Sequence, residues 1–247
     1  NFGKSYIYGK PAMDLIFERM PATLELVAVA ACLVLCIAIP LGVYAGAYPK
    51  RASSKLIMSG SILGISLPSF WVGMMMIYIF AVVLRLLPAS GRGNTVMVGN
   101  VALSIFAPGG IRYVILPAIT LALTNVATML RLTRSGILEN MRQDYIKFAR
   151  AKGVPAKSIL FGHALKNALI PVVTIFGMDL GNMIAFTTIT ETIFSWPGMG
   201  KLLIDAINKS DRPIIVAYLM AAACMFVVLN FIVDILYTLI DPRIELR

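Results

Sequence analysis

Five stretches of this chain are each long and apolar enough to cross a lipid bilayer, and they limit the possible folds more than any other feature. Because a helix rises about 1.5 Å per residue and the hydrocarbon core is about 30 Å thick, about 20 apolar residues are needed to span it. The stretches are Leu26–Ala47, Leu56–Leu84, Tyr113–Leu130, Lys166–Glu191 and Ile214–Val233. The sequence therefore predicts an all-α membrane protein in which residues 1–247 form one transmembrane domain with five spanning helices.

The composition supports this class of protein. Of the 247 residues, 59% are hydrophobic and 14% are charged, whereas soluble domains carry about 25% charged residues. The formal net charge of +10 could indicate a nucleic-acid partner, but the cations lie in short loops between apolar stretches and form no continuous solvated face. We therefore expect membrane lipid, and no nucleic acid, around this chain.

The distribution of Lys and Arg predicts the orientation, because loops rich in these residues stay in the cytoplasm. Residues 131–166 carry eight of them against two acids, Glu139 and Asp144. We predict that this loop and the C-terminus are cytoplasmic, and that the N-terminus and the loop 190–213 lie outside. The N-terminus has no signal-like apolar core and does not begin with Met, so we expect a further N-terminal helix that is missing from this sequence.

A glycine and a proline divide the central loop into two predicted helices. Apolar residues at helical spacing predict a helix from about Ser135 to Lys152. Gly153 supplies a stop, and Pro155 begins a second helix. Such a bend fits a groove on another protein, but a basic amphipathic element also suits the anionic inner leaflet, and the residues leave both open. The chain has no glycine-rich phosphate loop, so an ATPase that drives it would be a separate chain.

Polar residues inside the fourth apolar stretch are candidates for a translocation path. Asp179, Asn182 and Thr187 lie there, and the first two are about 60° apart on a helix. An acid within a membrane span is costly and indicates a functional site, although Asp179 could instead pair across a subunit interface. Asp234, near the end of the last stretch, is expected to have a structural role.

The outside loop 190–213 offers a second candidate site. Phe194 and Trp196 are expected in an aromatic belt at the membrane boundary. A turn and then a short interfacial helix are expected to follow them. The loop is either a plain connection or an external lid over a path. Its candidate site residues are Trp196, Pro197, Gly198 and Gly200.

No metal or catalytic site is predicted. His163 is the single histidine, and no second ligand is spaced to form a metal site with it. The sequence pairs no nucleophile with a base, so we expect a protein that is not an enzyme.

The central loop resembles a known family signature. The stretch DYIKFARAKGVPAKSILFGHALKNALIPVVT, residues 144–174, is similar to the signature loop of binding-protein-dependent ABC transporter permeases, in which Glu-Ala-Ala precedes three residues and Gly. Ala149 and Gly153 match this pattern, whereas Lys147 and Phe148 depart from it. The variant is typical of the dipeptide, oligopeptide and nickel branch. So are RMPATLEL (19–26), LPASGRG (87–93), TETIFSWPGMG (190–200) and DILYTLIDPRI (234–244).

The resemblance implies the type I ABC importer permease fold, with six helices in the full family member, in a bacterial or archaeal plasma or inner membrane. It implies a second homologous permease, two cytoplasmic ABC ATPases and an extracytoplasmic substrate-binding protein that contacts the outer surface, including residues 196–200. This chain would bind no cofactor, and ATP and magnesium would lie on the ATPases. The ATPase-coupling residues would be Asp144, Ala149, Arg150, Ala151, Lys152, Gly153 and Pro155.

The resemblance favours di- and oligopeptides as substrates, with nickel or glutathione as alternatives in the same branch. A self-contained secondary transporter or channel is a hypothesis of another class, but the sequence shows no inverted second half and no cluster of ionisable residues within the spans. A membrane scaffold that recruits a soluble partner is a third hypothesis. Substrate-stimulated ATPase activity would separate it from an importer.

Overall fold

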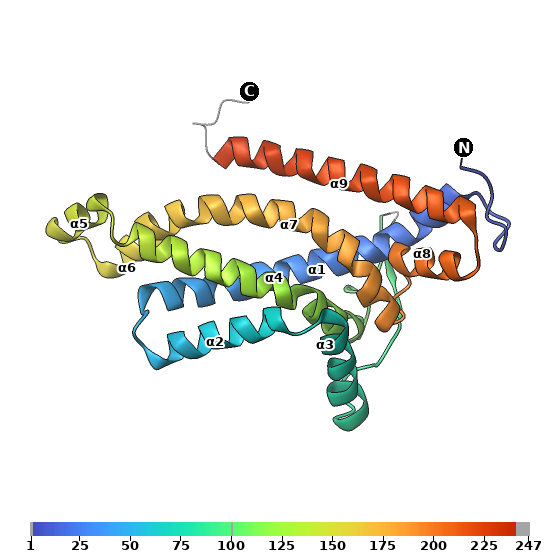
Figure 1. Ribbon diagram of the computed structural model, residues 1–247, viewed down its shortest axis with the longest axis horizontal. Coiled ribbons are helices and arrows are strands. Elements are labelled where there is room, and N and C mark those ends of the chain that lie inside the picture. The colour runs from blue at the N-terminus through green and yellow to red at the C-terminus, as the bar shows by residue number, and fades with distance from the viewer. Residues whose placement is uncertain (1, 100, 241–247) are drawn as a thin grey trace. The chain divides into compact units, whose positions relative to one another are not determined.

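The computed structural model describes residues 2–99 and 101–240, apart from the side chains of residues 234 and 236–240. The described chain is mostly helical, with one short hairpin (Figure 1). The elements are α1 (Ala12–Ala47), α2 (Ala52–Ser66), α3 (Ser69–Met76), the π-helical η1 (Ile77–Val83), β1 (Val96–Val98), β2 (Val101–Leu103), α4 (Ile111–Asn140), α5 (Asp144–Ala151), α6 (Ala156–Ser158), the π-helical η2 (Ile159–Ala164), α7 (Leu165–Ile193), α8 (Met199–Asn208) and α9 (Arg212–Ile240).

Four helical stretches among the described residues are long and apolar enough to cross a membrane. They are α1, α4, the run 156–193 that contains α7, and the part of α9 from 212 to 233. A fifth span is formed by α2 together with α3 and η1 if this bent pair counts as one crossing. The predicted multi-pass helical class is confirmed, and the predicted number of spans is reached when the bent pair is included.

The second predicted span, Leu56–Leu84, is not one continuous helix, which corrects the sequence prediction. The helix α2 ends at Ser66 and α3 begins at Ser69. Proline disfavours helical backbone in the residue before it, and Leu67, which precedes Pro68, is extended with ψ 131°. The proline therefore ends one helix and starts the next.

The described chain divides into two compact units. The hairpin unit contains the described parts of 1–31, 68–122 and 180–230, including β1 and β2. The turn unit contains the described parts of 32–67, 123–179 and 231–247, including the turn between α5 and α6. The helices α1, α4, α7 and α9 each contribute one part to either unit.

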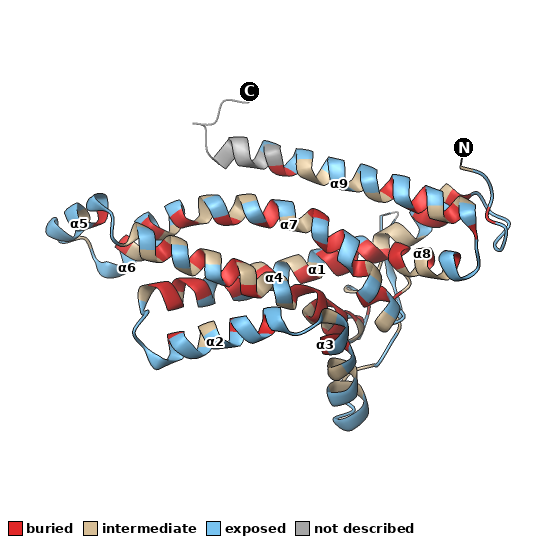
Figure 2. Cartoon of the chain, in the orientation of Figure 1, coloured by how far each residue is buried: buried red, intermediate tan, exposed pale blue. Residues whose placement is uncertain are grey.

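The hairpin unit is built around an apolar cluster from α1, α8 and α9, whose buried positions are visible in Figure 2. The buried members are Ala12, Leu15, Ile16, Met199, Leu202, Ala206, Ile214, Ala217, Tyr218 and Ala221. The strands β1 and β2 pair antiparallel, with Met97 opposite Ala102. The short helix expected within the loop 190–213 is confirmed as α8, and its buried face packs into this cluster. Its interfacial position stays a prediction.

In the turn unit, two glycines allow α1 and α4 to pack at close range. A Cβ atom at Gly42 would lie 2.6 Å from Cβ of Thr133, and one at Gly46 would lie 2.7 Å from Cβ of Ile137. Small residues let membrane helices approach closely where the hydrophobic effect cannot drive association. The apolar cluster that includes Ile137 consists of Val43, Ile137, Ile146, Ile159, Ala164 and Ala168.

The helix α9 leaves much of its apolar surface exposed (Figure 2). The exposed large side chains are Val216, Leu219, Met220, Phe226, Val227, Val228, Phe231, Ile232 and Ile235. Apolar surface on a span is the kind that lipid or a partner helix covers. This distribution therefore agrees with α9 as a membrane span.

Candidate functional site

The signature loop folds into a helical turn formed by α5 and α6, which joins α4 to η2 and α7 (Figure 1). The predicted single helix from Ser135 to Lys152 is wrong, because α4 ends at Asn140 and α5 begins at Asp144. The amide of Asn140 donates to the carbonyl oxygen of Gly136 at 2.9 Å, and such a side-chain bond competes with the main-chain bonds of a continuing helix. Gln143, with ψ 153°, is then extended before α5.

Gly153 closes α5 in the manner that the sequence predicts. The N–H of Gly153 donates to the carbonyl of Arg150 at 3.0 Å, and the N–H of Val154 donates to that of Ala149 at 3.1 Å. This pair of bonds is a Schellman closure, which requires a left-handed residue, and Gly153 has φ +76°. No described atom lies within 4 Å of the place that its Cβ would occupy. The glycine is therefore required by backbone conformation and forms an open corner.

The turn has one buried face and one exposed face. Ile146 and Ile159 are buried in the apolar cluster of the turn unit, with Ala149 and Val154 packed against it. By contrast, the predicted coupling residues Arg150, Ala151, Lys152, Gly153 and Pro155 are exposed. The turn is thus anchored from one side and presents its corner on the other.

Two local side-chain contacts lie on the exposed face. Lys147 Nζ lies 2.8 Å from Asp144 Oδ1, and this hydrogen bond lowers the pKa of the Asp144 carboxyl. The Nζ of Lys152 lies 4.5 Å from the centroid of the Phe148 ring. Phe148 itself is exposed. The exposed face therefore combines basic groups with an aromatic ring, and aromatic residues are enriched at protein interfaces.

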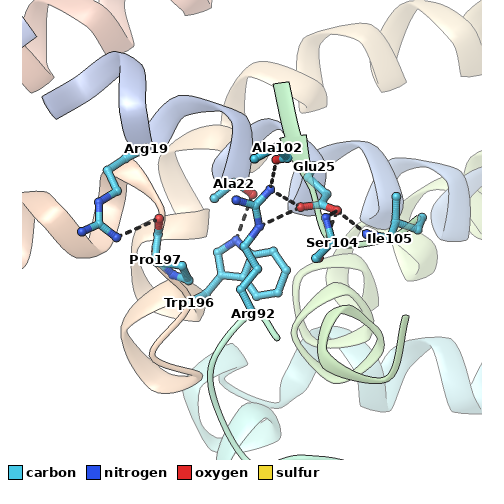
Figure 3. Close-up of polar contacts among 9 residues, drawn as sticks. All are labelled: Arg19, Ala22, Glu25, Arg92, Ala102, Ser104, Ile105, Trp196 and Pro197. Atoms are coloured by element: carbon cyan, nitrogen blue, oxygen red, sulfur yellow. Dashed lines mark hydrogen bonds and ion pairs between the residues drawn. The ribbon is translucent and has the colours of Figure 1, made fainter. Parts of the chain in front are cut away.

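In the hairpin unit, Glu25 collects a set of hydrogen bonds from distant parts of the chain (Figure 3). Its Oε1 accepts from the N–H groups of Ser104 and Ile105, each at 2.6 Å. Its Oε2 accepts from Arg92 Nε at 2.9 Å, and Arg92 also donates to the carbonyl of Ala102. The Glu25 side chain is 2% exposed. One buried carboxylate thus holds the segment that contains β1 and β2 against α1.

Trp196 belongs to the core of this unit, which corrects the aromatic-belt prediction. Trp196 and Phe194 are 0% and 2% exposed. The indole Nε1–H of Trp196 donates to the carbonyl of Ala22 at 2.9 Å (Figure 3). Arg19 donates to the carbonyl of Pro197 at 3.5 Å. The loop after α7 folds back onto α1, so its aromatic rings pack inside the unit.

Glu191 and Thr23 fix the beginning of α8. Thr23 donates to Glu191 Oε1 at 2.6 Å and accepts from the N–H of Met199 at 2.9 Å. Glu191 Oε2 accepts from the N–H of Lys201 at 2.9 Å. These bonds satisfy amides that a helix N-terminus leaves unpaired. A side chain at Gly198 would overlap the Glu191 carboxylate, so this glycine is required by close approach.

Sequence reasoning missed Glu25, Arg92 and Glu191. The signal was present, because each lies in a stretch typical of the peptide branch: RMPATLEL, LPASGRG and TETIFSWPGMG. The structure brings these three stretches together, and the N–H of Gly91 also donates to the carbonyl of Phe194 at 2.9 Å. They form a single buried cluster in the hairpin unit.

The predicted path residues lie along α7 with different surroundings. Asp179 is half-buried, Asn182 is exposed and Thr187 is buried. The hydroxyl of Thr187 donates to the carbonyl of Ile184 in its own helix. The side chain of Asp234, for which a structural role is predicted, lies outside the described set. The assignment of these residues to a path stays a prediction.

Solved structures share this fold. A chain from "Inward facing conformations of the MetNI methionine ABC transporter" matches with TM-score 0.71 and 16% identity, covering 94% of this chain and 98% of that chain. A chain from "Crystal structure of an amino acid ABC transporter with histidines" matches with TM-score 0.58 and 14% identity, covering 94% of each. The fold is therefore that of type I ABC importer permeases, as the signature loop predicts.

The sequence comparisons place the chain within a family. Residues 38–246 match the family "Binding-protein-dependent transport system inner membrane component", and the chain belongs to it. The oligopeptide transport system permease protein AppB of Bacillus subtilis is 41% identical over 99% of this chain and 76% of its own length. The dipeptide transport system permease protein DppB of Escherichia coli is 36% identical over 95% of this chain and 74% of its own length. The resemblance to ABC permeases of the peptide branch is confirmed, and the chain is a multi-pass transport subunit.

Proposed function

We propose that this chain is the permease subunit of an ATP-driven importer and forms, with a second homologous permease, the path for di- or oligopeptides. Relatives that match almost the whole chain carry peptide-transport names, and the fold is that of importer permeases. Nickel or glutathione is the alternative substrate within the same branch. The single observation that carries the proposal is the exposed Gly153 corner within the matched signature loop.

The turn between α5 and α6 is the contact for a cytoplasmic ATPase in this proposal. The corner at Gly153 is open, and Arg150, Ala151 and Lys152 beside it are exposed. The buried face of the turn connects it to α1 and α4 through the apolar cluster of the turn unit. A push on the corner would thus reach helices that span the membrane. Two ATPases, one for each permease, would hold the ATP and magnesium.

The orientation follows from the same loop. Eight Lys and Arg residues lie in 131–166 against two acids, and cytoplasmic loops carry such an excess. We therefore place the turn, and with it the C-terminus, in the cytoplasm. The loop 190–213 then lies outside. The C-terminal residues 241–247 lie outside the described residues.

On the outside, an extracytoplasmic substrate-binding protein would dock on the hairpin unit. The predicted contact residues Trp196, Gly198 and Gly200 are buried, so their role is to fix the shape of the surface. Pro197 is half-buried beside Arg19. The binding protein would instead contact the exposed side chains that surround these buried residues. Calorimetry of the cognate binding protein with peptides, nickel and glutathione tests the substrate class.

Substitution of Gly153 tests the coupling. Valine at φ +76° is strained because a β-branched side chain disfavours the left-handed region, whereas asparagine tolerates it. We expect Gly153→Val to abolish ATP-driven peptide uptake in proteoliposomes that contain the whole complex, while the permease remains in the membrane. Gly153→Asn should keep the turn and retain more uptake. Unchanged uptake in Gly153→Val would contradict the proposal, and uptake by the permease alone along an ion gradient would favour a secondary transporter.

A further inference from the structure

An apolar groove lies in the turn unit where the end of α1 meets α6 and η2. Its volume is about 370 Å³, within the range of small-ligand sites. Pro40, Tyr44 and Tyr48 line one side, and Leu160 and Phe161 line the other. Phe161 is 58% exposed and Tyr48 is 45% exposed. The groove is therefore open to the surroundings of the helices.

The walls of the groove are held by the packed core behind them. Val43 lines the groove and also belongs to the buried apolar cluster with Ile159 and Ala164. Leu160 and Leu165, which line the opposite wall, pack against the same cluster. The groove is thus a formed feature of the turn unit and does not depend on the positions of exposed side chains alone.

The rim of the groove is cationic. Among the described residues, Lys157 is the one charged side chain that lines it, and it is exposed. Arg51 stacks on the ring of Tyr48, with its Cζ 4.3 Å from the ring centroid. Lys50, the residue before Arg51 in the chain, is also exposed. No acid is among the described residues that line the groove, so the rim attracts anions.

The position of the groove is that of the membrane boundary. The helix α1 is a candidate span that ends at Ala47. Tyr44 and Tyr48 stand at that end, where tyrosines favour the level of lipid headgroups. The hydroxyl groups of Tyr44 and Ser53 are 2.8 Å apart, which fixes a polar edge above the apolar floor. An occupant must therefore be apolar at one end and anionic at the other.

We propose that this groove binds an anionic phospholipid of the leaflet next to the α5–α6 turn. One acyl chain lies between α1 and η2, and the headgroup phosphate contacts Lys157 and Arg51. Because α6 and η2 follow the Gly153 corner directly, the lipid holds the turn to the end of α1. The inference rests on the proposed function only in assigning that leaflet to the cytoplasm.

Photolabelling of the complete transporter in nanodiscs tests this site. The probes are phosphatidylglycerol and phosphatidylcholine that carry the same diazirine-labelled acyl chain, and labelled peptides are mapped by mass spectrometry. We expect phosphatidylglycerol to label the segments 39–48 and 156–165, and phosphatidylcholine to label them several-fold less. A basic residue near the surface contributes about fivefold to anionic lipid binding. Lys157→Gln and Arg51→Gln should therefore each lower the labelling by roughly that factor.

Two further variants make the test specific. Arg142→Gln removes an exposed cation of the same unit that does not line the groove, and its labelling should match that of the unchanged chain. Ala156→Trp fills the groove and should remove labelling by both lipids.

Equal labelling by the two lipids would overturn the proposal, as would labelling that falls on a partner subunit and leaves the segments 39–48 and 156–165 unlabelled. Labelling requires no ATP, so a failure of the Gly153 uptake test would leave this result standing.

Discussion

The interior of each of the two units is stabilised by a different kind of interaction. In the hairpin unit, buried polar groups far apart in the sequence are joined: Glu25 to Arg92, and Trp196 to Ala22. In the turn unit, the buried cluster is apolar, and the side-chain bonds that join Tyr145 to Asn140 and to Asn167 are exposed. Buried polar networks fix one geometry. The hairpin unit is therefore built as a fixed surface, whereas the turn unit leaves its corner free for a partner.

The largest effect is expected when the buried carboxylate of the hairpin unit is removed. Glu25→Ala removes the carboxylate that accepts from Arg92 and from the amides of Ser104 and Ile105, and removing one partner of a buried ion pair costs about 3–5 kcal/mol. Thermal unfolding of the purified permease should show this loss. Glu18→Ala removes an exposed ion pair with Lys10 and should change little. Equal effects of the two variants would show that the buried carboxylate does not hold the hairpin unit together.

A smaller loss is expected from a single hydrogen bond in the same unit. Trp196→Phe keeps an aromatic ring but removes the donor to the buried carbonyl of Ala22, which costs about 1–3 kcal/mol. Trp71→Phe is the matched control, because Trp71 is 42% exposed. Limited proteolysis after residue 193 should rise only in Trp196→Phe. Identical proteolysis of the two variants would show that the indole bond does not hold the loop.

Packing is the corresponding test of the turn unit. Gly42→Ala places a methyl group against Thr133 and the carbonyl oxygen of Leu130, which lies 2.8 Å from the added atom. Overpacking of this kind costs about 1–3 kcal/mol. At Gly60 no described atom lies within 4 Å of an added Cβ, so Gly60→Ala should be neutral or stabilising. A neutral Gly42→Ala, measured by thermal unfolding, would mean that α1 and α4 are not closely packed.

The smallest effect is expected at the exposed face of the turn. Lys147 lowers the pKa of Asp144, so the stability from this pair is present above the unfolded-state pKa, near 4. It is lost as the pH falls through the lowered folded-state value. Asp144→Asn should therefore leave thermal unfolding near neutral pH unchanged within error, because exposed pairs contribute little. A clear shift at neutral pH would show that Asp144 has a buried partner.

Local patterns in the sequence predict much of the fold. Apolar stretches longer than the bilayer is thick predict spans without knowledge of their neighbours, and Gly153 predicts its own turn through backbone conformation. Leu67 and Pro68 show the limit of counting apolar residues, because a proline divided a stretch of suitable length. The break after Asn140, where Gln143 is extended before α5, is not indicated by the helical periodicity of the apolar residues.

The polar cluster of the hairpin unit could not be predicted in the same way. Glu25 and Arg92 are 67 positions apart, and nothing local to either indicates the other. An aromatic residue at the end of a span is equally consistent with a membrane belt and with a folded core. Trp196 lies in the core because the loop returns onto α1, and the sequence does not indicate this return. Glu191 lies at the end of an apolar stretch, where an acid is expected to reach water. Its bonds with Thr23 and Lys201 therefore have no local signal in the sequence.

The central claim is that an ATPase engages the Gly153 corner, and a cross-link tests it most directly. Ala151 is exposed beside the corner, so Ala151→Cys can carry a short photoreactive group in the assembled transporter. The account predicts that the cross-link joins this chain to the ATPase subunit and that its yield changes when ATP binds. A label recovered on lipid alone, with ATP-driven uptake intact, would contradict the account.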